Sequence, residues 1–317
     1  MDDGTQQVRS EAMADLLDTL DLTSEGSARI TVESSTDEPV EVGTSSADVF
    51  VGRSQPMPYG RAFGGQVLAQ ALIAGSLTLR EEHPERHPHS LHAYFMRPGD
   101  ASQPIRFAVE RMRDGRSFST RRVHAIQRGA PILSMTASFQ DDAGGIDHQD
   151  EAPEVPGPDE LPSLADQFSG IDDPKARHIV SRPIEHRHVQ GSVSLHPAAD
   201  ASPDQDVWFR AVGPVADDPF LRAAVLAYAS DYTVLEPALR RHGLSWADHR
   251  LRPASLDHAM WFHRPVDPAQ WLLYSQHSPS AQGGRGLSFG RIFDHDGRLV
   301  ASVAQEGMLR VKDETKG

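Results

Sequence analysis

The sequence of 317 residues contains no cysteine. This absence excludes disulfide bonds, thiolate metal sites, iron–sulfur clusters and a cysteine nucleophile. No run approaches the roughly 18 apolar residues that a membrane-spanning helix needs, and residues 1–4 lack the basic region and apolar core of a signal peptide. We therefore expect a soluble protein without a membrane span, in the reducing environment of the cytoplasm.

Positive charge is also scarce. Lysine and arginine number 31 against 45 aspartates and glutamates, which gives a net charge of −14, and only Lys175, Lys312 and Lys316 are lysines. A nucleic-acid-binding protein needs a basic face that replaces the counterions of the phosphates, so nucleic acid is excluded as a general partner. Hydrophobic residues make up 38% of the chain, which is enough for packed cores, and the length predicts about two domains.

Two polar segments divide the chain. An amphipathic helix over residues 13–22 precedes an acidic, Ser/Thr-rich stretch over 30–47, which reads as a surface insertion or a short hairpin, with disorder as the alternative. A second polar stretch, rich in proline and glycine, has the composition of a linker. The predicted organisation is an N-terminal helix with an acidic insertion (1–47), a first unit (48–145), a linker (146–175) and a second unit (176–317).

Both units show the same plan of one apolar helix followed by strands. The first helix is expected over 63–79, and the second starts at Asp218-Pro219 and runs toward Gly243. The strand-like runs are 90–97, 104–112, 116–127 and 131–140 in the first unit, and 251–265, 270–278, 285–294 and 298–310 in the second. This plan predicts an α+β fold built from a duplicated unit of a helix on an antiparallel sheet, with the two sheets joined edge to edge.

Asp231 is the most informative position for chemistry. It is the only carboxylate in the apolar stretch 223–235, so it should lie inside the protein. An unpaired buried carboxylate is costly or shifts its pKa upward, so polar groups should converge on it, as they do around a catalytic base. The alternative is an acid at a helix end near Pro237 that reaches only water or a backbone amide. The equivalent helix of the first unit carries no acid, which predicts one acid-bearing site per chain.

Three other patterns are weaker candidates. Residues 286–290 match the G-x-S-x-G elbow around Ser288, but a hairpin and a strand follow where that motif requires a helix. The pair His186 and His188 is read as an exposed strand face rather than a metal site. We predict that a second cluster lies in a solvated connection and does not bind metal; it consists of His83, His87, His89 and His92. We therefore predict no metal.

Four segments together resemble the acyl-CoA thioesterase II family of double-hotdog fatty acyl-CoA hydrolases. They are FGGQVLAQAL (63–72), RPGD (97–100), SLDHAMWFHRP (255–265) and VAQEG (303–307). The resemblance covers roughly residues 48–145 and 205–312, and it implies that each unit is a hotdog, a central helix wrapped by a curved antiparallel sheet. Carried over position by position, it implies a catalytic set of Asp231, Ser255 and Gln305, with serine where many relatives have threonine.

The resemblance implies hydrolysis of medium- to long-chain acyl-CoA by an activated water, without an acyl-enzyme. CoA would be part of the substrate, so no cofactor is needed, and a homo-oligomer (dimer or tetramer) is expected. Backbone N–H groups at a helix start would stabilise the oxyanion. The candidate substrate-binding residues are Gly64, Gly65, Gln66, Arg116, Arg122, Arg285 and Arg291.

Two other function classes stay open at this point. One is a hotdog protein that binds acyl-CoA or acts as a dehydratase without hydrolysing the thioester, in which His258 or His263 would work beside the acid. The other is a non-enzymatic scaffold with a degenerate site.

Overall fold

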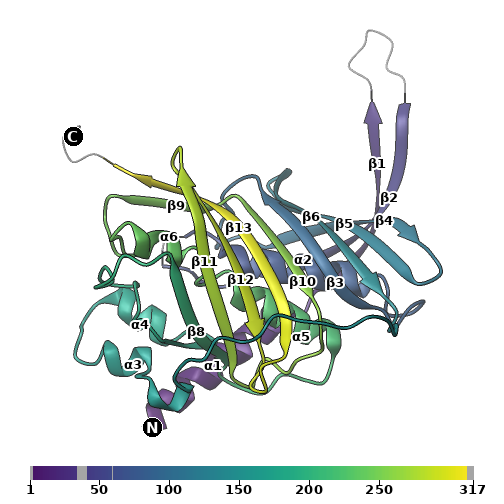
Figure 1. Ribbon diagram of the computed structural model, residues 1–317. Helices are drawn as coiled ribbons and strands as arrows, with labels where there is room; N and C mark the ends of the chain where they lie inside the picture. The colour runs from purple at the N-terminus through teal and green to yellow at the C-terminus, as the bar shows by residue number, and fades with distance from the viewer. Residues whose placement is uncertain (1–2, 34–40, 59, 313–317) are drawn as a thin grey trace.

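The computed structural model describes residues 3–33, 41–58 and 60–312. These residues form an α+β structure in which 13 strands make one antiparallel sheet and the two longest apolar helices pack on one face of it. Figure 1 shows these two helices behind the strands and the hairpin of the first two strands projecting from one end.

The first half contains the N-terminal helix, the projecting hairpin, one central helix and four further strands. Its elements are α1 (Asp3–Leu20), β1 (Thr23–Glu33), β2 (Glu41–Gly52), α2 (Gly64–Leu77), β3 (His87–Phe95), β4 (Ile105–Asp114), β5 (Phe118–Gln127) and β6 (Ala130–Gln140). For the residues described, the acidic segment is thus part of a hairpin. The end of β2 pairs with β4, so the hairpin continues the first sheet.

The second half repeats the plan after a connecting region. Its elements are η1 (Pro158–Glu160), α3 (Leu164–Gln167), α4 (Pro174–Val180), β7 (Ile184–His188), β8 (Asp204–Ala211), α5 (Pro219–Ser230), α6 (Glu236–Arg241), β9 (Leu251–Ser255), β10 (Asp257–Phe262), β11 (Leu272–Gln282), β12 (Arg285–Phe293) and β13 (Leu299–Val311). Strand β8 was not expected, and β7 was expected only as a strand face around His186 and His188. The segment 189–203, which contains three serines, three alanines and two prolines, separates β7 from β8, so their pairing cannot be read from neighbouring residues.

The strand order explains how the two halves join. It runs β2-β4-β5-β6-β3 in the first half and β8-β11-β12-β13-β10 in the second, and β3 pairs with β10. Since the two orders correspond strand by strand, the duplication is confirmed, and the two sheets meet edge to edge as predicted. Residues of α2 and α5 belong to one apolar core, so the two central helices share their buried surfaces across the junction.

Two predicted elements are broken in the structure. The expected helix from Asp218 toward Gly243 ends at Ser230, and a turn separates α5 from α6. Pro237 lies in the first turn of α6 and has no N–H to donate to a carbonyl one turn earlier, so it interrupts the hydrogen bonds of a continuous helix. The expected strand 251–265 is likewise divided at Leu256 into β9 and β10, both of which pair with β13.

The polar segment between the two halves is packed rather than free. Residues 141–157 have no helix or strand and lie along the second half of the sheet. The indole N–H of Trp208 donates to the carbonyl of Pro156 at 2.9 Å, and the Gln149 amide donates to the Gly297 carbonyl at 2.9 Å. This strap therefore covers the sheet surface opposite to the central helices. In the described residues, no helix is long and apolar enough to cross a membrane.

Candidate active site

Asp231 lies at the C-terminal end of α5, where it is the capping residue with helical backbone angles. The apolar helix carries it into the protein, and the break before α6 leaves its side chain free to turn toward the sheet. Its side chain reaches Ser255 at the end of β9 and Gln305 in the middle of β13. The structure therefore brings the three predicted residues together from segments that are 24 to 74 positions apart.

The hydrogen bonds among these three residues are mutually consistent. The side-chain NH₂ of Gln305 donates to Asp231 Oδ1 at 3.0 Å and to Ser255 Oγ at 3.1 Å. The hydroxyl of Ser255 donates to the same carboxylate oxygen at 3.3 Å. Because both partners meet Oδ1, that oxygen is held in place.

The N-terminus of α2 closes the other side of the carboxylate. A Cβ atom on Gly64 would lie 2.7 Å from Asp231 Oδ2, and one on Gly65 would lie 2.5 Å from the Tyr228 carbonyl oxygen. The two glycines therefore permit the close approach of the start of α2 to the end of α5. The backbone N–H of Gly65 favours the charged form of Asp231, and the positive end of the helix dipole acts in the same direction.

The environment of Asp231 raises the pKa of its carboxyl to about 6. The largest cause is removal from water, which outweighs the hydrogen bonds from Gln305, Gly65 and Ser255 that favour the carboxylate. An acid with this pKa is ionised at neutral pH and is still basic enough to accept a proton during a reaction.

His258 lies on the other side of Gln305. It is fully buried, its Nδ1 makes a very short contact with Gln305 Oε1, and its Nε2 lies 3.0 Å from Ser230 Oγ. Burial lowers the pKa of His258 to about 4, so the ring is neutral at pH 7. The sequence offered His258 only as a residue that would work beside the acid, whereas the structure places the Gln305 amide between them.

Three aromatic residues that lie close to the two glycines and to Asp231 in the sequence pack against one another, and they were not predicted. The ring of Phe63 stacks on Tyr232 with centroids 4.5 Å apart and meets Tyr228 edge to face at 5.2 Å. The hydroxyl of Tyr228 donates to Gln55 Oε1 at 2.9 Å. The signal was present in the sequence, because Phe63 directly precedes the two glycines and the tyrosines flank Asp231.

Gln66 does not turn toward Asp231. Its Oε1 accepts from the backbone N–H of Gln55 at 3.0 Å, and its NH₂ donates to Gln70 Oε1 at 3.0 Å and to the Arg53 carbonyl at 3.4 Å. With its amide used in this way, Gln66 joins α2 to the segment that follows β2.

The four arginines proposed as phosphate contacts are not gathered around the acid. On β12, Ser288 and Gly290 face the central helices, so Arg285 and Arg291 lie on the opposite face, where they pair with Glu306 and Asp150. Arg122 lies on the exposed face of β5, and Arg116 lies in the bend before that strand. Their role toward CoA stays a prediction.

The alternative motifs take other places in the fold. Ser288 lies in the middle of β12, opposite Gln305 on β13, and no helix follows it as a nucleophile elbow would require. Its buried hydroxyl has no partner among the described residues.

The reading of His186 and His188 as an exposed strand face was wrong, because both side chains are buried. His188 Nε2 lies 2.9 Å from Glu236 Oε2, and the ring of His186 packs against Tyr232. The two histidines are buried because β7 contacts α3 and because His188 reaches Glu236 on α6. Among the described residues, no group of three or more His, Asp or Glu side chains could hold a metal ion.

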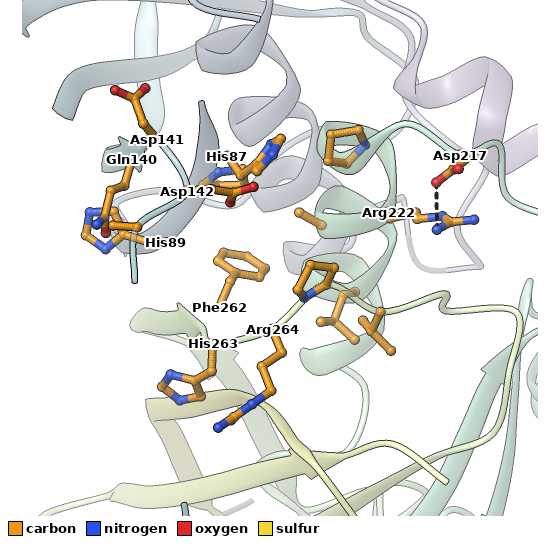
Figure 2. Close-up of a pocket in the computed structure, with 17 residues that line it drawn as sticks. His87, His89, Gln140, Asp141, Asp142, Asp217, Arg222, Phe262, His263 and Arg264 are labelled. Carbon is orange, nitrogen blue, oxygen red and sulfur yellow. Dashed lines mark ion pairs between the residues drawn. The ribbon is translucent and has the colours of Figure 1, made fainter. Parts of the chain in front are cut away.

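The reading of the other histidine cluster as a solvated connection was also wrong in part. His87, His89 and His92 lie on β3, where the first two are half-buried and only His92 is exposed. His87 and His89 line a pocket of about 440 Å³ at the N-terminal end of α5, together with Phe262 and the ion pair of Asp217 and Arg222 (Figure 2). The described residues that line this pocket do not include Asp231, Ser255 or Gln305.

Comparison with known proteins identifies the family. An acyl-CoA thioesterase family model matches residues 176–308, and an acyl-CoA thioesterase N-terminal domain model matches residues 53–140. The chain belongs to the acyl-CoA thioesterase II family. It is an enzyme of the thioester hydrolase class, and each half is a hotdog.

Individual relatives agree with this assignment. The chain is 40% identical to human acyl-coenzyme A thioesterase 8 over 280 residues, which cover 84% of this chain and 86% of the human protein. It is 37% identical to acyl-CoA thioesterase 2 of Haemophilus influenzae, with 84% and 93% covered. The crystal structure of an acyl-CoA thioesterase II from Mycobacterium marinum is 42% identical, with a TM-score of 0.69 over 94% of this chain and 99% of that one. A hotdog protein from Alicyclobacillus acidocaldarius, at 18% identity and a TM-score of 0.70, shows the same fold.

Proposed function

We propose that this chain hydrolyses medium- to long-chain acyl-CoA to a free fatty acid and CoA, with Asp231 as the general base that activates water. The observation that carries the proposal is the convergence of Ser255 and Gln305 on one oxygen of an aspartate whose pKa is raised to about 6. The family supplies the substrate class, because its named members are acyl-CoA thioesterases.

The reaction proceeds by direct attack of water on the thioester carbonyl carbon. As the new C–O bond forms, a proton passes from the water to the Asp231 carboxylate. The tetrahedral intermediate then breaks the C–S bond, and the CoA sulfur leaves with a proton returned from the Asp231 carboxyl. Ser255 and Gln305 hold Oδ1, and Oδ2, which lies beside the start of α2, is the oxygen that would take the proton.

The start of α2 is the proposed oxyanion site. Its first backbone N–H groups have no partner within the helix, and all of them except that of Gly65, which favours the charged form of Asp231, are candidate donors. The positive end of the dipole lies at Gly64 and Gly65, beside the carboxylate. Donors of this kind stabilise the negative charge that develops on the carbonyl oxygen, and one donor contributes roughly 10²–10³ in rate in other enzymes. The first hotdog would thus complete a site whose acid comes from the second.

The dehydratase alternative receives no support from the geometry. A catalytic histidine would have to reach the reacting atoms beside Asp231. The side chain of His258 is instead buried between Gln305 and Ser230, and His263 bonds to Ser302.

The proposal is tested by following thiol release from a panel of C2 to C18 acyl-CoAs with a thiol-reactive dye. Because the chain has no cysteine, all of the dye signal comes from CoA. Release that is fastest with medium and long chains supports the proposal, and no release with any chain length would overturn it. Light scattering after size-exclusion chromatography tests the proposed homo-oligomer, and fractionation of the source cells tests the cytoplasmic location.

A further inference from the structure

We propose that His258 is a positioning residue for the hydrolysis, which in its neutral tautomer protonated on Nδ1 holds the amide of Gln305 with its nitrogen toward Asp231. The inference rests on the proposed function, and it assigns a role in the catalytic arrangement to a residue outside the set of Asp231, Ser255 and Gln305.

The two ends of the Gln305 amide have different partners. In the arrangement seen, the NH₂ end donates to Asp231 and to Ser255, while Oε1 points to His258. If the amide rotated by half a turn, its oxygen would face the Asp231 carboxylate, and two acceptors would repel each other. A hydrogen-bond donor at Oε1 therefore selects the productive orientation.

His258 can supply that donor in only one neutral form. Nδ1 lies against Gln305 Oε1, which only accepts, so the proton must be on Nδ1. Nε2 is then an acceptor that lies 3.0 Å from Ser230 Oγ. The single hydroxyl proton of Ser230 can go to the Ala227 carbonyl at 2.9 Å or to Nε2, and the proposed tautomer takes it to Nε2. The resulting chain of donors runs from Ser230 through His258 and Gln305 to Asp231, and each member fixes the orientation of the next.

The surroundings of His258 favour this neutral form. The side chain is fully buried on β10, one strand away from Gln305 on β13, and opposite Ala93 on β3. Burial lowers the pKa of His258 by more than the hydrogen bond with Gln305 raises it. A neutral ring offers one donor and one acceptor, and both are used.

Matched substitutions distinguish positioning from simple packing. In His258→Asn the amide nitrogen can occupy the place of Nδ1 and keep the donor, whereas His258→Leu fills similar space without one. We expect kcat to fall about tenfold to a hundredfold in His258→Leu, the usual cost of losing such a bond and leaving Oε1 unpaired. KM should change little, and His258→Asn should recover most of the loss.

Two further readouts separate the proposal from a structural role. In His258→Leu the acid limb of the pH–rate profile should move to higher pH, because Gln305 no longer holds its N–H on Asp231. In a Gln305→Ala background, His258→Leu should have almost no further effect on kcat. Equal losses in the Asn and Leu variants with an unmoved acid limb, or additive losses with Gln305→Ala, would overturn the proposal.

The tautomer can be measured without any activity. Long-range ¹H–¹⁵N spectra of the wild-type protein, assigned by comparison with His258→Asn, should show Nδ1 of His258 protonated and Nε2 unprotonated at pH 7. The opposite tautomer would overturn the proposal even in a fully active enzyme. Conversely, a protein with the expected tautomer and no thioester hydrolysis would refute the proposed function alone, because this measurement needs no substrate.

Discussion

At the scale of single residues, the site depends on an aspartate kept out of water and held by neutral donors. Ser255 and Gln305 do not carry charge, so they orient Asp231 without lowering its pKa to the range of a salt-bridged carboxylate. This balance leaves a carboxylate that is ionised at neutral pH and that, in the proposed mechanism, accepts a proton from water. Three predictions follow from the state of this one side chain.

The first prediction concerns the base itself. Asp231→Asn keeps the size of the side chain and removes its basicity, so kcat should fall by about 10²–10⁴ with little change in KM. Ser255→Ala and Gln305→Ala should each cost less, because these residues orient the base. Steady-state kinetics of thiol release measures all three variants.

Ser288→Ala is the matched control, since this hydroxyl is buried opposite Gln305 but has no partner among the described residues. It should leave kcat almost unchanged. An inactive Ser288→Ala enzyme with a trapped acyl-serine, together with an active Asp231→Asn, would replace water attack by a covalent mechanism.

The second prediction is the pH dependence of the rate. Because burial raises the pKa of Asp231 to about 6, kcat/KM should rise with pH below about 6 and become level above it. A profile over pH 4.5–8.5 with a long-chain substrate measures this limb. A flat profile across pH 6 would show that Asp231 is not the base.

The third prediction is a gain in stability on removing the charge. The pKa of Asp231 in the folded protein, about 6, lies above the 3.8 of a free aspartate, so the carboxylate destabilises the fold above pH 6 and costs nothing below pH 4. Asp231→Asn should therefore raise the free energy of unfolding by about 1–3 kcal/mol at pH 8, and the gain should vanish as the pH falls toward 4. Urea unfolding at several pH values measures it.

Asp248 provides a control of opposite sign. Hydrogen bonds and charge from Arg250 lower the pKa of Asp248 to about 2, so its contribution is present above pH 4 and is lost as the pH falls toward 2. Asp248→Asn should destabilise the protein at pH 8. A loss of stability in Asp231→Asn as well would mean that the carboxylate is not strained.

At the scale of elements, the site exists because the start of one helix meets the end of another. Helix α5 stops at Ser230 and presents Asp231, while α2 begins with two glycines that let its backbone come close. The proposed site therefore needs both the end of α5 at Ser230 and the two glycines that begin α2. We expect a single added methyl group to disturb the contact between these two helix ends.

The fourth prediction tests this contact. In Gly64→Ala the new Cβ would lie 2.7 Å from Asp231 Oδ2 and 3.2 Å from Phe95, so the carboxylate must move. We expect kcat to fall about tenfold to a hundredfold, as small displacements of reacting groups do, while stability changes little because alanine favours the helix. Gly144→Ala, in the strap with no atom within 4 Å of the new Cβ, is the control and should retain full activity. Full activity in Gly64→Ala would show that the close approach is not needed.

At the scale of the whole molecule, the duplicated hotdogs have diverged. The residue that caps α2 is Thr78, whose hydroxyl donates to the Gly75 carbonyl and accepts from Arg121, whereas the corresponding cap of α5 is Asp231. The first unit thus contributes a helix start and the second contributes the acid. One catalytic site per chain is the expected consequence.

The fifth prediction concerns metal. The chain has no cysteine, and its described residues hold no cluster of metal ligands, while the proposed chemistry uses only a carboxylate and neutral donors. Treatment with EDTA should leave the rate of thiol release unchanged. A loss that added Zn²⁺ or Mg²⁺ restores would overturn the metal-free mechanism.

The sequence by itself predicted the α+β architecture and a buried Asp231 with polar partners. The apolar faces of two helices and the alternating strands, repeated in order, predict the double α+β unit. A single carboxylate in an apolar stretch predicts polar groups around it. These features are local, so they can be read from neighbouring residues. The sequence motifs that resemble the family then predicted Ser255 and Gln305.

Only the tertiary structure decided what surrounds the acid. That Asp231 caps a helix, that His258 reaches Gln305 and not the acid, and that the histidines of β7 are buried all depend on pairings between distant segments. The same holds for the arginines of β12, whose strand face is fixed by its register with β13. Register and helix-end contacts are set by packing over the whole chain, and no window of sequence contains that information.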